Sequence, residues 1–192
     1  ISVTGLQTCA LPILESAKLA RKIHVGKNVE FVRVQGELAY VTYEPSGPGA
    51  PGESKKSKGK EDDDDVPAEI AVVDWVHGKL VTSMKAGLET EGIEFTPDGK
   101  MMLVANEGDN SISVYERSSG KVLRKIDVAS FGNRPRGIKI SPDGKTFAVT
   151  LEGSDKMVLI DAQYKPIKAV PTKKAPYGVS YDPAGKRIFV AA

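Results

Sequence analysis

The sequence predicts an all-β fold built from repeated antiparallel sheets. Three stretches resemble one another closely: GIEFTPDGKMMLVANEG from Gly92, GIKISPDGKTFAVTLEG from Gly137 and GVSYDPAGKRIFVAA from Gly178. Their turn glycines recur at intervals of 45 and 41 residues, a period that is typical of propeller blades and of paired-helix solenoids. Between the turns the chain is rich in Val, Ile and Tyr and lacks helical periodicity, which favours blades over helices.

The copy that begins at Gly92 predicts one blade of four short strands. A Pro-Asp-Gly-Lys turn follows the first strand, and its glycine tolerates the positive φ that a tight hairpin requires. A Ser-Ser-Gly turn separates the third strand from the fourth. The expected strands end at Phe95 and then cover 101–105, 112–115 and 122–128.

The same pattern continues on both sides of this blade. The next copy runs through Ile138, Phe147, Val158 and Ile167, and an earlier copy is recognisable over 29–34, 38–42, 70–74 and 78–80. LARKIHVG from Leu19 matches VLRKIDVA from Val122, which predicts the last strand of a still earlier blade. We therefore expect a fragment of a β-propeller with four-stranded antiparallel blades, about three whole blades plus two partial ones.

Two segments are expected to lie outside the repeats. Residues 3–13, VTGLQTCALPI, resemble a translated sequencing adapter, so residues 1–13 are interpreted as non-native, with a signal-peptide remnant as the alternative. The partial propeller then covers 14–192. Because Cys9 is the only cysteine, this interpretation excludes disulfides, thiolate catalysis and Cys-zinc sites from the visible blades.

An insertion interrupts the earliest whole blade over residues 43–69. It combines Gly, Pro and Ser with a basic block at 55–60 and an acidic block at 61–65. Such a composition buries too little apolar surface to fold, so we expect a disordered loop. It either attracts a cationic protein partner or remains a solvated loop whose two blocks neutralise each other.

Overall charge and hydropathy restrict the class of protein. The net charge of +2 over 192 residues argues against a dedicated nucleic-acid surface, and no apolar run approaches the length of a membrane span. Cysteine-free blades suit the periplasm and also the cytosol.

RPRGIKISPDGKTFAVT from Arg134 and APYGVSYDPAGKRIFVAA from Ala175 resemble the YVTN-type β-propeller repeat. Proteins with this architecture include periplasmic and cell-surface propellers of unknown ligand, the haem d1-binding domain of cytochrome cd1 nitrite reductase, and seven-bladed lactonases. The resemblance therefore implies a binding role, a cofactor role or a lactonase activity without choosing among them.

Loops between second and third strands, and loops between blades, are expected to gather on one face around the channel mouth. This face would collect Glu89, Thr90, Glu91, Glu107, Asp109, Asn110, Arg134, Arg136, Glu152, Ser154, Asp155, Lys173, Lys174 and Tyr177. The opposite face carries the PDGK and SSGK turns, which we interpret as structural.

Arg134 and Arg136 flank Pro135 just before an inner strand, where they would offer a planar cationic fork to a carboxylate or a phosphate. The alternative is that one arginine pairs with a glutamate of the neighbouring blade. The candidate ligand-binding residues are Arg134, Arg136, Glu91, Glu107 and Tyr177.

Other chemistries have weaker support. Glu91, Glu107, Asp109 and Glu152 offer oxygen ligands to Ca²⁺, although their spacing matches no compact metal loop, and Asp and Asn also form turns. His24 and His77 are expected on the surface rather than on a haem iron, so haem d1 enters only through the family resemblance. No catalytic triad or carboxylate pair supports a hydrolase. Trp75 and Tyr115 are expected to pack between blades.

The sequence therefore favours a non-catalytic binding module, exported to the periplasm or cell surface, that contacts an unknown protein or small molecule through the channel-mouth face. The alternatives are a redox or cofactor-binding propeller similar to the haem d1 domain, and a lactonase-like hydrolase.

Overall fold

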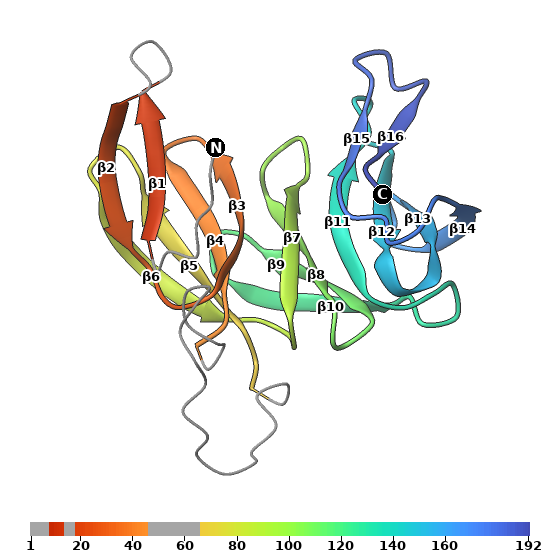
Figure 1. Cartoon of the computed structure of the whole chain (residues 1–192), viewed down its shortest axis with the longest axis horizontal. Helices are drawn as coiled ribbons and strands as arrows, with labels where there is room; N and C mark the ends of the chain where they lie inside the picture. Colours follow the sequence, from red (N-terminus) through yellow and green to blue (C-terminus); the bar gives the residue numbers. More distant parts are fainter. Residues whose placement is uncertain (1–7, 14–17, 46–65) are drawn as a thin grey trace. The chain divides into compact units, whose positions relative to one another are not determined.

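The computed structural model describes residues 8–13, 18–45 and 66–192. Among these residues, antiparallel sheets and one short 3-10 helix are the regular elements (Figure 1). The chain divides between Leu88 and Glu89 into two compact units.

The first unit contains a two-stranded sheet and one whole blade. Strands β1 (Thr8–Ile13) and β2 (Lys18–His24) pair with each other. The blade is a four-stranded sheet in chain order, made of β3 (Val29–Gln35), β4 (Leu38–Tyr43), β5 (Glu69–Asp74) and β6 (Lys79–Lys85).

The second unit contains two whole blades and a further hairpin. The first blade consists of β7 (Thr90–Phe95), β8 (Met101–Asn106), β9 (Ser111–Glu116) and β10 (Lys121–Asp127). The second consists of β11 (Pro135–Ile140), β12 (Thr146–Leu151), β13 (Lys156–Asp161) and β14 (Pro166–Pro171), with the helix η2 (Glu152–Ser154) after β12. The hairpin is β15 (Val179–Tyr181) with β16 (Ile188–Val190).

These sheets confirm the predicted fold class. Three sheets have four antiparallel strands, and β15 with β16 forms half a further blade, as the repeat pattern predicts. The pairing of β1 with β2 was not predicted, because residues 1–13 were interpreted as non-native. Asp74, Glu116 and Asp161 each end a third strand, so the first whole blade has the same internal alignment as the others. The predicted strand at Leu19 is β2.

The turn between first and second strands is held by the side chains of its own motif. Thr96 Oγ1 donates to Asp98 Oδ1 at 2.7 Å, and the same Asp98 oxygen accepts the amide of Lys100 at 3.0 Å. Ser141 and Asp143 repeat this arrangement in the next blade. These hydrogen bonds lower the pKa of both aspartates. The structural interpretation of the PDGK turns is thereby supported by their geometry.

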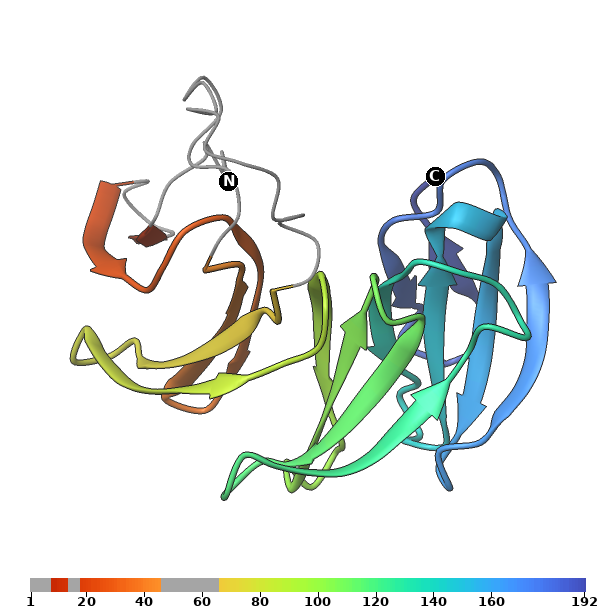
Figure 2. The ribbon, with the colours of Figure 1, turned by 90° about the horizontal axis from the view of Figure 1, so that it is seen from below.

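The core of the second unit lies between its two whole blades. Large aliphatic and aromatic side chains from both sheets, including Leu103, Ile112, Phe147 and Ile160, are almost completely buried there. Strand β11 packs against both β7 and β15, and Figure 2 shows the two four-stranded sheets next to each other. The sheets are therefore joined through their first strands and through an apolar inter-sheet core, as a propeller requires.

The outermost strand of every whole blade has a β-bulge at the same place. The register of β6, β10 and β14 shifts at Val81, Leu123 and Ile167, which are the extra residues. Each of these three aliphatic side chains is about half exposed. A bulge bends an edge strand and interrupts its row of hydrogen-bonding groups, which hinders pairing with a further strand.

Two segments with predictions of their own lie at the margins of the blades, the insertion and residues 1–13. The ends of the insertion over 43–69 are adjacent, because Tyr43 and Glu69 pair across β4 and β5 and the Tyr43 hydroxyl donates to the Glu69 carboxylate. Residues 46–65, with both charge blocks, lie outside the described residues. Residues 1–7 also lie outside them, and the origin of residues 1–13 stays a prediction, because the pairing of β1 does not report where a segment comes from.

The two aromatic residues expected to pack between blades differ in exposure. Tyr115 on β9 is buried. Trp75 is 38% exposed in the turn after β5, and its indole Nε1 donates to the Gly36 carbonyl of the same blade at 3.0 Å. The turn therefore provides the polar partner that an indole N–H requires, and Trp75 is not an inter-blade packing residue.

Candidate functional site

The inner strands of the second unit begin with a repeated backbone conformation. Glu89, Arg134 and Ala175 precede them with φ of 46°, 57° and 50°, a left-handed conformation that non-glycine residues seldom adopt. The preceding blade fixes it: Asn110 Oδ1 accepts the Arg134 amide at 2.8 Å, and Asp155 Oδ1 accepts the Ala175 amide at 2.9 Å. Asn110 and Asp155, which the sequence analysis placed on the channel-mouth face, thus anchor the start of the next blade.

This repeated entry brings different side chains to equivalent positions of successive blades. Glu91, Arg136 and Tyr177 each lie two residues after the left-handed residue. Glu107 and Glu152 each follow a second strand and donate their amides to the carbonyls of Glu89 and Arg134. The side chains meet at the boundary between the two whole blades. We call this group the inter-blade cluster: Glu91, Glu107, Arg134, Arg136 and Glu152.

Arg136 is the centre of the inter-blade cluster. Its Nη2 lies 2.6 Å from Glu91 Oε1, and its Nη1 lies 2.9 Å from Glu152 Oε2. Its Nε lies 3.0 Å from Glu107 Oε2. The guanidinium carbon lies 4.3 Å from the centroid of the Tyr177 ring. Three carboxylates and one aromatic face therefore surround a side chain that is only 16% exposed.

Arg134 occupies the outer side of the same cluster. Its Nη2 pairs with Glu107 Oε1, and its Nε lies 3.5 Å from Glu152 Oε2. Unlike Arg136, its side chain is 51% exposed. The two arginines of the predicted fork therefore differ: Arg136 is enclosed between blades, and Arg134 faces solvent along one edge.

Burial dominates the electrostatics of Glu107. Its side chain is 3% exposed, and this burial raises the pKa of Glu107 to about 7, against the opposing charge of Arg136. The negative charges of Glu91 and Glu152 raise the Glu107 pKa further. Burial alone would lower the pKa of Arg136, but the hydrogen bond and charge of Glu91, together with the charge of Glu107 and an interaction with Tyr177, raise that pKa overall. Arg136 is thus held as a permanent cation beside a carboxyl group that titrates near neutrality.

Tyr177 is positioned by its backbone rather than by its hydroxyl. The Tyr177 carbonyl accepts a 2.8 Å hydrogen bond from Thr150 Oγ1, which also accepts the Gly137 amide at 2.8 Å. A Cβ at Gly137 would collide with the same Tyr177 carbonyl oxygen, so only glycine permits this approach. Tyr177 is 51% exposed, and its ring covers the Arg136 guanidinium.

The sequence places this geometry in a known family. The sequence profile described as "Lactonase, 7-bladed beta-propeller" matches residues 78–179, just over half of the chain. The chain belongs to this lactonase family. The match covers both whole blades of the second unit and hence every residue of the inter-blade cluster.

Several solved structures have the same fold as this lactonase-family chain at low sequence identity. Hydrazine synthase of Kuenenia stuttgartiensis is 23% identical, with a TM-score of 0.67 over 87% of this chain and 43% of that one. A functionally unknown protein of Desulfotomaculum acetoxidans is 16% identical, with a TM-score of 0.74 over 98% of this chain and 57% of that one. A chain of a mitotic checkpoint complex is 11% identical, with a TM-score of 0.74 over 97% and 53%. At these identities the likeness concerns the fold alone.

The lactonase-family chain spans about half the length of these solved chains. A comparison with curated proteins gives no match. Over the described ranges, none of the helical structure is long and apolar enough to cross a membrane.

Sequence reasoning found most of the cluster and missed several of its contacts. It placed Arg134, Arg136, Glu91, Glu107 and Tyr177 on one face, and the structure brings all five together. Arg136 pairs with glutamates of the neighbouring blade, which was the alternative interpretation of the fork. Glu152 was placed on the same face and weighed as a calcium ligand, but it was not named among the ligand-binding residues, although its alignment with Glu107 would have placed it in the cluster.

The calcium hypothesis meets an electrostatic objection. Three of the four proposed ligands surround the Arg136 guanidinium instead of an empty centre, and Asp109 lies 3.2 Å from Lys125 Nζ. Within residues 21–45 and 66–192, no group of three or more His, Cys, Asp or Glu side chains is arranged to hold a metal ion. A cation would have to displace the guanidinium that already neutralises these carboxylates.

The two histidines are surface residues, as predicted. His24 is exposed at the end of β2. His77 is exposed in the turn after β5, where its Nδ1 lies 2.8 Å from Asp74 Oδ2. Its position is therefore accounted for by a turn contact.

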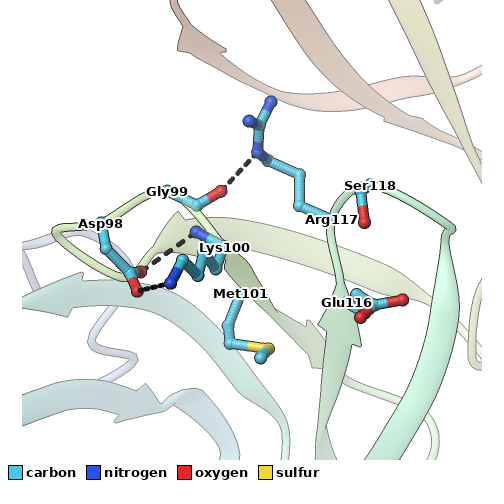
Figure 3. Close-up of a pocket in the computed structure, with 7 residues that line it drawn as sticks. All are labelled: Asp98, Gly99, Lys100, Met101, Glu116, Arg117 and Ser118. Carbon is cyan, nitrogen blue, oxygen red and sulfur yellow. Dashed lines mark hydrogen bonds and ion pairs between the residues drawn. The ribbon is translucent and has the colours of Figure 1, made fainter.

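One pocket lies at the opposite end of the β7–β10 blade from the inter-blade cluster (Figure 3). It is formed by the β7–β8 and β9–β10 turns. Arg117 Nε donates to the Gly99 carbonyl across it, and Lys100 Nζ lies 3.9 Å from Asp98 Oδ2 (Figure 3). These two contacts connect groups of the turns themselves.

Proposed function

We propose that this chain is a non-catalytic binding module whose ligand surface lies where the inner strands of the second unit begin. The observation that supports this proposal is that the two arginines differ in their exposure to solvent. Arg136 is enclosed by three carboxylates and a ring, whereas Arg134 and Tyr177 are each 51% exposed. Arg136 would therefore build the surface, and Arg134 and Tyr177 would contact the ligand.

The chemistry of these two exposed groups suggests a class of ligand. The outer edge of a guanidinium binds a carboxylate or a phosphate, and the open face of a tyrosine ring accepts a flat or apolar group. Lys173 and Lys174, both exposed, immediately precede this segment and add positive charge. We therefore propose a small ligand, or a protein side chain, that joins an anionic group to a ring.

Benzoate is a suitable probe because it combines a ring with a carboxylate. We expect benzoate to shift the amide NMR signals of residues near Arg134 and Tyr177. Arg134→Gln and Tyr177→Ala should each weaken binding at least about fivefold, a loss of roughly 1 kcal/mol. Lys100→Gln, at the far end of the blade, is the matched control and should bind normally. Binding that survives both substitutions would contradict this surface.

Lactone hydrolysis is the second candidate, and two observations favour it. The family profile is that of lactonases, and Glu107 titrates near neutrality between two guanidiniums, as a general base would. Against it, the Glu107 side chain is 3% exposed and so has little access to a substrate. Hydrolysis of glucono-δ-lactone above its spontaneous rate, lost in both Glu107→Gln and Arg136→Met, would favour this candidate. Turnover that is absent, or unchanged in the variants, would exclude it.

Export to the periplasm or cell surface also belongs to this proposal. It rests on the family resemblance; the scarcity of cysteine, with Cys9 alone in the chain, is compatible with this location and with the cytosol. Cell fractionation of the producing bacterium, with an antibody raised against the second unit, would test it. Recovery of the protein in the cytosolic fraction would contradict export.

A further inference from the structure

Two neighbouring methionines on β8 have very different surroundings. Met101 and Met102 are the first two residues of this strand, so their side chains point to opposite faces of the sheet. Met102 is completely buried, whereas Met101 is only partly buried. Met157 on β13 is 8% exposed, and Met84 lies in the first unit on the outer strand β6. Met101 is therefore the most accessible methionine of the second unit.

The pocket in Figure 3 brings solvent to the Met101 side chain. It has a volume of about 210 Å³, and Met101 is the only sulfur-containing residue that lines it (Figure 3). A water molecule takes up about 30 Å³ in the liquid, and hydrogen peroxide has only one oxygen atom more. An uncharged oxidant of this size can therefore enter the pocket and reach the thioether.

Met101 also lies at the boundary between the two whole blades. It packs against the apolar core that both blades share, as does Ile140 of β11. In the following blade, Thr146 holds the position of Met101, and Tyr181 of β15 holds that of Ile140. The Thr146 and Tyr181 hydroxyl oxygens lie 3.2 Å apart. One boundary thus has a polar pair where the other has a thioether and an aliphatic side chain.

A change of polarity at Met101 would therefore meet an unsuitable environment. Oxidation converts a methionine sulfur into a sulfoxide, a polar group whose oxygen accepts hydrogen bonds. The Ile140 side chain offers no donor to it, and a polar group held against an apolar core without a partner costs free energy. The sulfoxide is better hydrated in the pocket, so the Met101 side chain is expected to leave the core and weaken its packing.

We propose that Met101 is a site of reversible oxidation by peroxides and that its sulfoxide loosens the contact between the two whole blades. A lone pair of the sulfur attacks one peroxide oxygen, the O–O bond breaks and an S–O bond forms. The sulfur is oxidised and the peroxide is reduced, and the departing hydroxide takes the proton of the attacked oxygen to become water. A methionine sulfoxide reductase reverses the change. This proposal does not depend on the ligand surface around Arg134.

The hairpin that carries Met101 would keep its own hydrogen bonds. Thr96 Oγ1 accepts the Met101 amide at 3.0 Å, and the Met101 carbonyl accepts the Thr96 amide at 3.1 Å. These bonds involve the backbone of Met101 and not its sulfur. Strand β8 also packs against β11 of the next blade. The effect of oxidation is therefore expected in the packing between β8 and β11 rather than in the pairing within the β7–β10 sheet.

Peroxide oxidation of the folded chain, followed by peptide mass spectrometry, tests the site without any substitution. Met101 and Met102 lie in the same tryptic peptide, and its fragmentation shows which of them carries the oxygen. Met101 should be oxidised at least about tenfold faster than Met102 or Met157, because oxidation follows exposure. The rates should become equal in a denaturing concentration of urea. Equal rates for Met101 and Met102 in the folded chain would overturn the proposal.

The consequence for the boundary is tested with Met101→Leu, which keeps the volume and removes the sulfur. Peroxide should lower the urea midpoint of the wild type and speed amide exchange at β8 and β11, and it should do neither in Met101→Leu. Reductase treatment should restore the wild-type values. Met84→Leu, the matched control in the first unit, should respond to peroxide as the wild type does.

Two results would show that oxidation of Met101 does not loosen the boundary. One is an unchanged urea midpoint and unchanged exchange in wild-type chain whose Met101 is fully oxidised. The other is an equal loss of stability in peroxide-treated Met101→Leu, because any oxidation of Cys9 or Met84 is common to both proteins. Benzoate binding near Arg134 is a separate measurement, so failure of this proposal and failure of the binding surface are distinguishable.

Discussion

The Nη2 atom of Arg136 lies 2.6 Å from Oε1 of Glu91, and the two residues hold the same position in consecutive repeats, 45 residues apart. The repeat therefore builds a site through the difference between its copies. The turn motifs that the copies share hold each blade together, whereas one variable position alternates between a carboxylate, a guanidinium and a ring. Chemistry specific to this chain is thus expected at such non-identical positions.

Loss of the Arg136 guanidinium should strongly destabilise the folded chain. Arg136→Met keeps much of the side-chain volume but removes the buried cation that Glu91 and Glu107 share. We expect the free energy of unfolding in urea at pH 7 to fall by about 3–5 kcal/mol, the usual cost of breaking a buried ion pair. Arg134→Gln, at a half-exposed position, should cost about 1 kcal/mol or less. Equal losses of unfolding free energy in the two variants would show that the burial of Arg136 does not increase its contribution to stability.

A methyl group at Gly137 should force the blades apart. Its Cβ would meet the Tyr177 carbonyl oxygen, a backbone atom that cannot rotate away. Gly137→Ala should therefore lower the free energy of unfolding by about 1–3 kcal/mol, the usual cost of overpacking. Gly36→Asn is the control, because nothing lies within 4 Å of the added Cβ and asparagine tolerates positive φ. A neutral Gly137→Ala would mean that the blades approach less closely than described.

The hydroxyl of Thr150 should contribute more to the free energy of unfolding than an ordinary surface hydroxyl does. It bridges the Gly137 amide and the Tyr177 carbonyl at 2.8 Å each, and Thr150→Val leaves both without this partner. We expect a loss of about 1–3 kcal/mol in unfolding free energy and faster exchange of the Gly137 amide. The exposed Thr82→Val should change stability by less than about 0.5 kcal/mol. Unchanged exchange at Gly137 would show that water replaces the hydroxyl.

An arginine on an outer strand provides a weaker link between the same blades. Arg124 Nη1 donates to the Gln163 carbonyl at 2.8 Å, and its guanidinium lies 5.8 Å from the Tyr164 ring centroid. Because the contact is exposed, Arg124→Ala should lower the unfolding free energy by only about 0.5–1 kcal/mol. Lys121→Ala on the same strand serves as the control. A loss above about 2 kcal/mol would indicate a role beyond this contact.

Local signals made the blades predictable. The turn at Asp98 is closed by side chains within four residues of it, and strand alternation is likewise a short-range pattern, so both can be read directly from the sequence. The pairing of Arg136 with Glu91 was also within reach, because the repeat period reveals which residues of adjacent blades are equivalent.

Other contacts depend on how closely two backbones approach, which no pattern of residue types reports. Thr150 reaches Tyr177 because Gly137 lets the next blade come near. The pair Lys139 and Glu94, 3.0 Å apart, was missed for a similar reason, since it joins first strands of adjacent blades and depends on their distance. Trp75 was misplaced because its partner is a carbonyl in a turn of its own blade, which residue type does not show.

The bulges at Val81, Leu123 and Ile167 have a consequence for how such a chain can evolve. Each blade carries its own irregular outer edge, so a newly duplicated blade inherits this protection along with its strands. Duplication or deletion of a blade then changes the length of the array without creating a regular edge strand that would pair with strands of neighbouring molecules. The number of blades can then change during evolution, while the side chain at the variable position diverges in each copy.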